Sequence, residues 1–400
     1  MTARRYIKII VISTALGCVT AAYAGEMGRE EVISEILQNN PRLKALETSQ
    51  KSQSALLRNA GRLSSQPEVE FEHLWGTDDA KKWNIGLTQS FDWPGVYSKR
   101  GNEAEARIYA FRYLYAVEAR GVALEVRLLL ANAIYINKQL QLVSEISKNL
   151  SELKASVDMA YKRGQLTVLD VKKLDFEIYS VSARQGDLLE EQDKVMGQLE
   201  ALNGGKPINA DISAYVPEKL LDIDAYLAAA VENNPSVKAA DRNAQAARIA
   251  SGVAKAERMP GFSVGYRHAF EENTHFNGFS VSMTLPVFTN KAASVAADIE
   301  ARSLDFEATT AAVSAQSKVR ATYNDAVRRG NAMKGMSAVV LDDTYPGLLM
   351  MAYKGGQINV ITYLQEINYF QNARTEYLAA EYSYIVDLNE LNSNMDQYGL

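Results

Sequence analysis

Cysteine and histidine are scarce in this chain of 400 residues, which contains one Cys and three His. The cysteine, Cys18, lies in the N-terminal segment 1–24, so the remainder can form no disulfide and offers no thiolate to a metal ion. His73, His268 and His275 lack the close spacing of a zinc or catalytic motif. Motifs for a nucleophile elbow or a phosphate loop are also missing. We therefore expect no enzymatic activity, no cofactor and no bound metal.

Segment 1–24 has the pattern of a cleaved signal peptide. It begins with three cations, continues as an apolar run and ends in Ala-Tyr-Ala at 22–24, the small residues that signal peptidase prefers. The run is shorter than the about 20 apolar residues of a membrane-spanning helix. The sequence Ala-Leu-Gly-Cys at 15–18 is similar to a lipoprotein acylation box, so lipidation of Cys18 stays open as an alternative.

The chain carries a small net negative charge. The full chain has 43 Lys and Arg against 48 Asp and Glu, a formal charge of −5, and removal of segment 1–24 with its three cations lowers this charge to −8. Proteins that bind nucleic acid present a basic face, which this composition does not supply. We expect no nucleic-acid partner.

Proline is absent from one long stretch. No proline occurs between Pro94 and Pro207, and Gly121 is the only glycine between 102 and 162. Proline breaks helices and glycine weakens them, so the residues from about Asn102 to Lys162 are predicted to form one helix of roughly 90 Å at 1.5 Å per residue. Ordinary globular domains rarely contain a helix of that length.

Apolar residues in this stretch recur at the alternating steps of three and four that form a coiled-coil seam. A second helix, returning along the first, is predicted to supply the partner face. The seam residues are Val143, Ile146, Leu150, Leu153, Val157 and Ala160 on the first helix, and Val168, Val171, Leu174 and Ile178 on the second.

The chain also contains an internal twofold repeat. The segment YKRGQLTVLDV at 161–171 is similar to YKGGQINVITY at 353–363, and the two lie 192 residues apart. A second pair, LQNNPRLKALE at 37–47 and VENNPSVKAAD at 231–241, is offset by 194 residues. Several landmarks in one order at a nearly constant offset indicate a duplication.

We interpret the mature chain as two copies of one unit, 25–202 and 221–400. The linker between them, 203–220, contains two Pro and two Gly. In each copy we expect a helix after Asn-Asn-Pro, a β-hairpin, a long helix that runs to a glycine tip, and a returning helix. Pro94 and Pro286 mark the entry into the two long helices.

Two β-hairpins are predicted at about 67–91 and 260–285, where apolar and polar residues alternate. Surface hairpins with one buried face are the simplest interpretation, but a two-stranded ribbon is marginal alone and long helices offer little to cover it. Strands of roughly nine or ten residues that are apolar on one face suit the wall of a membrane barrel. The positions on the apolar face are Val69, Phe71, His73, Trp75, Trp83, Ile85, Leu87, Gln89, Phe91, Phe262, Val264, Tyr266, His268, Phe279, Val281, Met283 and Leu285.

Four strands cannot close a barrel in lipid, where an open sheet edge leaves backbone groups without partners. Several copies of the chain must therefore close the barrel together. Trp75, Trp83 and Trp93 all lie around the first hairpin, as expected of an aromatic girdle at a lipid–water boundary. The predicted fold class is mainly α with a small β part.

These features together resemble the TolC-type outer membrane efflux proteins, the outer membrane factor family. The resemblance covers essentially the whole mature chain, and QSFDWPGVYSKR at 89–100 is most similar to the branch that serves heavy-metal efflux. It implies a homotrimer whose protomers each give four strands to a twelve-stranded transmembrane β-barrel. It also implies that long coiled-coil helices continue this barrel as a periplasmic α-barrel.

The function that this resemblance implies is a passive exit duct in the outer membrane. An inner-membrane efflux pump of the resistance–nodulation–division type would supply the energy, and a periplasmic adaptor protein would join the two. Heavy-metal cations and drugs are the two expected cargo classes. The alternatives are a periplasmic adaptor (membrane fusion) protein, which would need further β-rich modules, and a structural coiled-coil protein that does not insert into a membrane.

The glycine tips are the parts that the resemblance places against the adaptor and at the closed end of the tunnel. Glycine permits the positive φ of a tight turn, so a purely structural turn is compatible with the same residues. The adaptor-docking residues implied are Arg163, Gly164, Gln165, Gly355, Gly356 and Gln357.

The resemblance also implies a gate. Asp170 corresponds to a position that pairs with a tyrosine, here Tyr353, in a hydrogen bond that would hold neighbouring hairpins closed. The arginine that the family has after the second glycine is Ile358 here, and its ring of aspartates falls on Thr362 and Gln365. The closed state is therefore expected to be built differently, without a cation-binding constriction at those positions.

Overall fold

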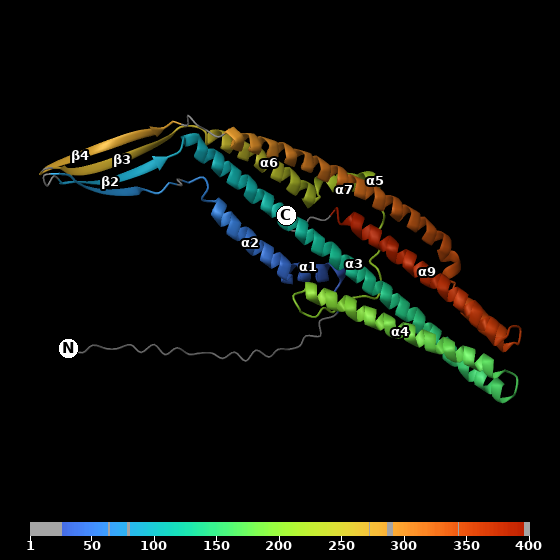
Figure 1. Cartoon of the computed structure of the whole chain (residues 1–400). Helices are drawn as coiled ribbons and strands as arrows, with labels where there is room; N and C mark the ends of the chain where they lie inside the picture. Colours follow the sequence, from blue (N-terminus) through green and yellow to red (C-terminus); the bar gives the residue numbers. More distant parts are fainter. Residues whose placement is uncertain are drawn as a thin grey trace, which may run out of the picture.

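The computed structural model describes residues 26–62, 65–77, 81–271, 273–285, 291–342 and 344–395. The signal peptide predicted at 1–24, with Cys18, and the predicted helix entry at Pro286 lie outside the described residues. Figure 1 shows a long, narrow molecule with a β-sheet at one end and the turns of two helical hairpins at the other.

Helices dominate the chain, and the strands interrupt them in two pairs. Two helices precede each pair, and a helical hairpin follows each pair. The elements are α1 (Arg29–Asn39), α2 (Pro41–Leu57), β1 (Glu68–Trp75), β2 (Lys81–Phe91), α3 (Pro94–Lys162), α4 (Val168–Leu202), α5 (Ile223–Glu232), α6 (Pro235–Ala256), β3 (Gly261–Glu271), β4 (Thr274–Thr284), α7 (Lys291–Val340), α8 (Tyr345–Lys354) and α9 (Val360–Asn392).

Helix α3 is one unbroken helix of 69 residues, which at 1.5 Å per residue is about 100 Å long. The predicted long helix is confirmed, and it begins earlier than expected, at Pro94. Proline is tolerated in the first turn because the N–H that it lacks would have no partner there. None of the described helices combines the length and the apolar character needed to cross a membrane.

Most of the residues predicted to lie in the seam between α3 and α4 are buried, except near the tip. Four of the five buried residues of α4 recur every seven positions, the spacing of a heptad. Val168 was expected in the seam but is 53% exposed, because it is the first residue of α4 and lies at the turn. Ala160, Val171 and Ile178 are half-buried. The buried seam residues are Val143, Ile146, Leu150, Leu153 and Val157 on α3 and Leu174, Val181, Leu188 and Val195 on α4.

The second long helix does not run unbroken to its tip, and this part of the prediction is wrong. Helix α7 ends at Val340, and α8 begins only at Tyr345. Pro346 occupies the first turn of α8, where it has no N–H to donate and its ring would clash with the preceding turn of a continuous helix. The Asp342 carboxylate accepts hydrogen bonds from the backbone N and the hydroxyl of Thr344 at 3.0 and 2.6 Å.

The helices predicted to follow the two Asn-Asn-Pro segments are present as α2 and α6. Each begins at its proline, Pro41 or Pro235, and the asparagine before it caps the helix. The Asn40 side-chain oxygen accepts from the backbone N of Leu43 at 3.1 Å, and Asn234 accepts from Ser236. Asparagine at this position satisfies N–H groups that the helix leaves without partners.

The strands form one antiparallel sheet in the order β1-β2-β3-β4. The two predicted hairpins are therefore neighbours, joined where β2 pairs with β3. The register places Trp83 opposite Phe270 and Leu87 opposite Tyr266, so the apolar faces of both hairpins become one face. Within the described residues β1 and β4 each pair on one side only, which leaves the sheet with two free edges.

Candidate functional site

The turn after α3 is a Schellman motif built around Gly164. Gly164 has φ 68°, and its N–H donates to the carbonyl of Tyr161 at 2.9 Å. The N–H of Gln165 donates to the carbonyl of Ala160 at 3.0 Å. This pair of bonds satisfies the last carbonyls of a helix and requires a left-handed residue, which glycine adopts without strain.

The turn after α8 repeats this geometry around Gly356. Gly356 has φ 70°, its N–H donates to the carbonyl of Tyr353 at 3.0 Å, and the N–H of Gln357 donates to the carbonyl of Ala352 at 2.9 Å. The positive φ predicted for both tip glycines is confirmed. The two tips are therefore the same turn built twice.

The helices that leave the two turns begin with different caps. Thr167 accepts a hydrogen bond from the backbone N of Asp170 at 3.3 Å, and the Asp170 carboxylate accepts from the N and the hydroxyl of Thr167 at 2.9 and 2.7 Å. This reciprocal pair is a capping box. In the second turn Asn359 alone accepts from the backbone N of Thr362, at 2.9 Å.

Each turn is anchored by one apolar side chain just after its glycine. Leu166 and Ile358 are half-buried and pack against the cluster that fills the seam. Ile358 stands where the resemblance implies an arginine, and its side chain packs against the core cluster. Sequence reasoning missed this role, although Leu166 and Ile358 are matched positions of the repeat.

The six residues predicted to dock an adaptor all lie at the surface of these turns. Arg163 and Gly355 are the C-caps of α3 and α8. All six are exposed: Arg163, Gly164, Gln165, Gly355, Gly356 and Gln357.

The predicted gate pair is not joined within one chain. The Asp170 carboxylate is engaged by Thr167, whose hydrogen bonds hold the pKa of Asp170 below its ordinary value. The ring of Tyr353 instead packs against Tyr363, with centroids 5.9 Å apart, and no hydrogen bond joins it to Asp170 among the described residues. Gln365 is exposed. The role of the pair between neighbouring hairpins stays a prediction.

The second functional region is the sheet, whose apolar face is uncovered by the described part of the chain. Its largest side chains are mostly solvent-exposed: Phe71 is 69%, Trp75 79%, Phe279 85% and Val281 79% exposed. A soluble monomer rarely leaves so much contiguous apolar surface in water. This face needs another apolar phase to cover it.

The opposite face of the sheet is polar. Arg267 makes an ion pair with Glu70 at 3.1 Å, and the Asn84 side chain donates to Glu72 at 2.5 Å. Between these charges the residues are small. A Cβ added to Gly265 would lie 2.7 Å from the hydroxyl of Ser280 and 2.9 Å from that of Thr88, so a larger residue would force these side chains to move.

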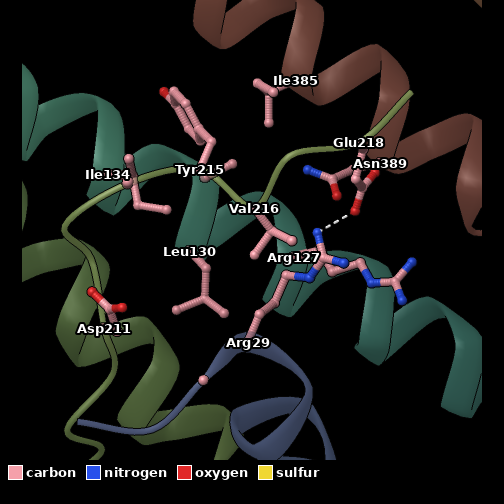
Figure 2. A pocket seen from close by; sticks show the side chains of 13 residues that line it. Arg29, Arg127, Leu130, Ile134, Asp211, Tyr215, Val216, Glu218, Ile385 and Asn389 are labelled. Atoms are coloured by element: carbon pink, nitrogen blue, oxygen red, sulfur yellow. Dashed lines mark hydrogen bonds and ion pairs between the residues drawn. The ribbon is translucent and has the colours of Figure 1, made fainter. Parts of the chain in front are cut away.

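A cavity of about 100 Å³ lies where α1, α3, α9 and the connection between α4 and α5 meet (Figure 2). Arg29 makes an ion pair with Glu218, drawn as a dashed line, while Arg127 is 5% exposed and lies 3.4 Å from Glu30. Burial raises the pKa of the Tyr215 phenol. The charges here are paired across segments far apart in the chain, which indicates a structural joint.

Among the described residues, no group of three or more His, Cys, Asp or Glu side chains is placed to hold a metal ion. The exposed tips and the two-faced sheet are therefore the candidate functional regions.

No family model and no curated protein matches this chain. Solved structures do. The outer membrane protein VceC of Vibrio cholerae is 15% identical over 92% of this chain and 95% of its own, with a TM-score of 0.74. The open MtrE outer membrane channel of Neisseria gonorrhoeae is 17% identical over 92% of this chain and 88% of its own, with a TM-score of 0.69. CusC, described for its transmembrane channel formation, is 17% identical over 92% of this chain and 91% of its own, also with a TM-score of 0.69. At these identities the likeness establishes the fold: the chain has the fold of solved outer membrane channels.

Proposed function

We propose that the chain is a TolC-type outer membrane channel and the passive exit duct of a tripartite efflux system. An inner-membrane pump, of the resistance–nodulation–division type, delivers the cargo through a periplasmic adaptor protein. The chain itself performs no chemistry. The solved neighbours described as outer membrane channels support this proposal.

One observation carries the proposal: among the described residues, the sheet has two free edges and an exposed apolar face. Lipid would cover that face, but an unpaired edge in lipid costs several kcal/mol for each unsatisfied backbone group. Pairing β1 of one protomer with β4 of the next removes both edges. Three protomers then form a closed barrel of twelve strands, with the polar face of Glu70 and Arg267 toward the lumen.

The same assembly extends to the helices. The order of elements, with a pair of strands and a helical hairpin in each half, supports the division into units 25–202 and 221–400 around a linker at 203–220. The hairpins of three protomers would form the wall of a periplasmic tunnel. The outer membrane location, with the helical portion in the periplasm, follows from this arrangement.

The tips are proposed as the contact with the adaptor and as the gate. The exposed docking residues lie at the end of the molecule opposite the sheet, where a periplasmic partner could reach them (Figure 1). In the closed trimer, Asp170 would pair with Tyr353 of a neighbouring hairpin. Thr167 donates to only one carboxylate oxygen of Asp170, Oδ2, so Oδ1 can accept from Tyr353 while the cap stays intact.

Heavy-metal cations are the first cargo class to test, because segment 89–100 resembles the heavy-metal branch. Tolerance to divalent metals and to drugs is to be measured in a deletion strain with and without the chain. Restored metal tolerance supports the metal branch. Restored drug tolerance alone assigns the chain to drug efflux.

Cysteine cross-linking tests the closed barrel directly, since the sequence after segment 1–24 contains no cysteine. Glu70→Cys on β1 is combined in turn with Gly278→Cys, Ser280→Cys or Ser282→Cys on β4. Two strands lie between these positions in one chain, a gap of about 14 Å at about 4.8 Å per strand, so a disulfide within one chain cannot form. We expect one combination to give covalent trimers in outer membranes.

Single-cysteine variants are the matched control, because one cysteine per chain can link two chains at most. Covalent dimers with Glu70→Cys alone would show that the linkage is unspecific. A chain that stays in the soluble periplasmic fraction and never cross-links would contradict the proposal. That result would favour an adaptor or a coiled-coil protein that does not insert.

A further inference from the structure

Two histidines face each other on strands β3 and β4. The Nδ1 atom of His275 lies 3.3 Å from the Nε2 atom of His268, and the ring centroids are 5.3 Å apart. In the register of the sheet, His268 is opposite Asn277 and His275 is opposite Phe270, so the two imidazoles are diagonal neighbours on one face.

The orientation of His268 is fixed by its other ring nitrogen. Its Nδ1 lies 2.8 Å from the side-chain oxygen of Asn277, which also accepts a hydrogen bond from the Tyr266 hydroxyl at 2.7 Å. An amide oxygen can only accept, so Nδ1 of His268 carries the hydrogen and Nε2 keeps its lone pair, directed at His275. Histidines that bind metals usually donate their second N–H to an oxygen in this way.

The separation of the two facing nitrogens suits a shared ion. Two nitrogens bound to one tetrahedral ion at the usual distance of about 2.0 Å lie about 3.3 Å apart. A slight outward rotation of the rings would place an ion between them without moving either strand. The ring of Trp83 lies beside the pair, 5.3 Å from the His268 ring, and shields one side of it.

We propose that His268 and His275 bind one divalent transition-metal ion across strands β3 and β4, with Asn277 and Tyr266 as positioning residues. Imidazole pairs favour Cu²⁺, Ni²⁺ and Zn²⁺ over harder ions. On binding, the hydrogen on Nδ1 of His275 moves to its Nε2, so both lone pairs face the ion. Water completes the coordination, because no third ligand side chain is placed there among the described residues.

This site is separate from the proposed transport path. It lies on the apolar face, whereas Glu70 and Arg267 lie on the polar face that would line the lumen. The ion would act as a clamp that joins the two strands near their turn. The inference needs only the β3–β4 pairing and does not depend on channel function.

Metal titration of the purified chain tests the site. The chain is expressed without a polyhistidine tag, held in detergent micelles at pH 7.5, and titrated with Cu²⁺, Ni²⁺, Zn²⁺ or Mn²⁺ by calorimetry. We expect one site per chain, tightest for Cu²⁺ and weakest for Mn²⁺. Cu²⁺ should also quench tryptophan fluorescence, because Trp83 adjoins the pair.

Substitutions distinguish the metal ligands from residues that do not bind the ion. His268→Ala or His275→Ala should abolish the site, and Asn277→Ala should weaken it by about tenfold to a hundredfold. The control is Ser282→Ala, which should leave the affinity unchanged. Ser282 is also on β4, opposite Ser263, but it lies seven residues from His275 and on the other face of the sheet.

Electron paramagnetic resonance of the Cu²⁺-loaded wild-type chain gives a readout that does not depend on how a variant folds. Hyperfine structure from two nitrogens supports the site, and a spectrum with one nitrogen or none overturns it. Equal Cu²⁺ affinity in wild type, His268→Ala and His275→Ala also overturns it. Loss of channel activity with intact metal binding would count against the proposed function only.

Discussion

The two helical arms end in the same turn but are supported differently. The first arm is α3 and α4 with the turn at Gly164, and the second is α7, α8 and α9 with the turn at Gly356. Helix α3 is unbroken and packs through a continuous seam, whereas α8 has ten residues of which only Leu349 is buried. Equal turns on unequal supports indicate that the second tip moves more easily than the first.

Core truncation should give the largest difference between the arms. Leu153 on α3 is 0% exposed, so Leu153→Ala should lower the free energy of unfolding by about 2–5 kcal/mol. Leu349 on α8 is already 9% exposed and belongs to a short helix that can shift, so Leu349→Ala should cost less. Urea unfolding followed by circular dichroism measures both. Equal losses would contradict the difference in support.

The tip glycines test whether the turns are truly equivalent. Gly164→Val and Gly356→Val should each cost about 1–2 kcal/mol, because a left-handed conformation strains any residue with a Cβ. An added Cβ meets nothing within 4 Å at either position, so the cost is conformational alone. Thermal unfolding of the two variants should show equal shifts.

The matched control is Gly186→Ala in the interior of α4, where an added Cβ also meets nothing within 4 Å. There the change should stabilise the helix by about 0.5–1 kcal/mol. Clearly unequal shifts for Gly164→Val and Gly356→Val would mean that the turns differ in spite of their matching hydrogen bonds.

Removing a helix cap at either tip should cost less stability than core truncation, and the loss should be larger in the first arm. Thr167→Ala and Asn359→Ala should each cost about 1 kcal/mol, and Thr167→Ala the more, because it also removes a donor to Asp170. Hydrogen exchange of the capped amides, those of Asp170 and Thr362, measures the loss at each site. Thr167→Ser keeps the hydroxyl and is the control. Faster exchange at Thr362 in Thr167→Ala would show that the arms are coupled.

Low pH should weaken the cap of the first tip and leave the cap of the second tip unchanged, in the wild-type chain. The pKa of Asp170 is held below its ordinary value of 3.8 by hydrogen bonds from Thr167. A lowered folded-state pKa contributes stability above the ordinary value, and that contribution is lost as pH falls below 3.8 through the folded pKa. Asn359 does not titrate, so only the first tip should loosen.

Amide exchange at the two tips, corrected for its intrinsic pH dependence, measures this effect. Asp170→Asn should remove the pH dependence of the first tip. Equal acid sensitivity at both tips would show that another group is responsible.

Features set by short sequence patterns could be predicted. The long helix depends on missing prolines, the strands on a period of two, and each tip on one glycine with a positive φ. The pattern Thr-x-x-Asp at 167–170 also signals a capping box, and it competes with the gate interpretation of Asp170. Pro346 signalled the break before α8, although the repeat favoured a continuous helix.

The rest depends on contacts that no local pattern specifies. Arg29 and Glu218 are 189 residues apart, and their pairing becomes apparent only when α1 and the linker segment meet. The junction between β2 and β3 and the convergence of His268 with His275 depend on strand register. Register follows from how whole faces are buried, so residue spacing alone did not reveal either one.

The free edges of the sheet also matter before assembly. A single chain, in the part that the structure describes, presents unpaired backbone at β1 and β4 beside a bare apolar surface, a combination that templates aggregation. Synthesis must therefore be matched by rapid capture of each chain, by chaperones or by other copies of the chain. Overproduction without that capture should yield insoluble deposits.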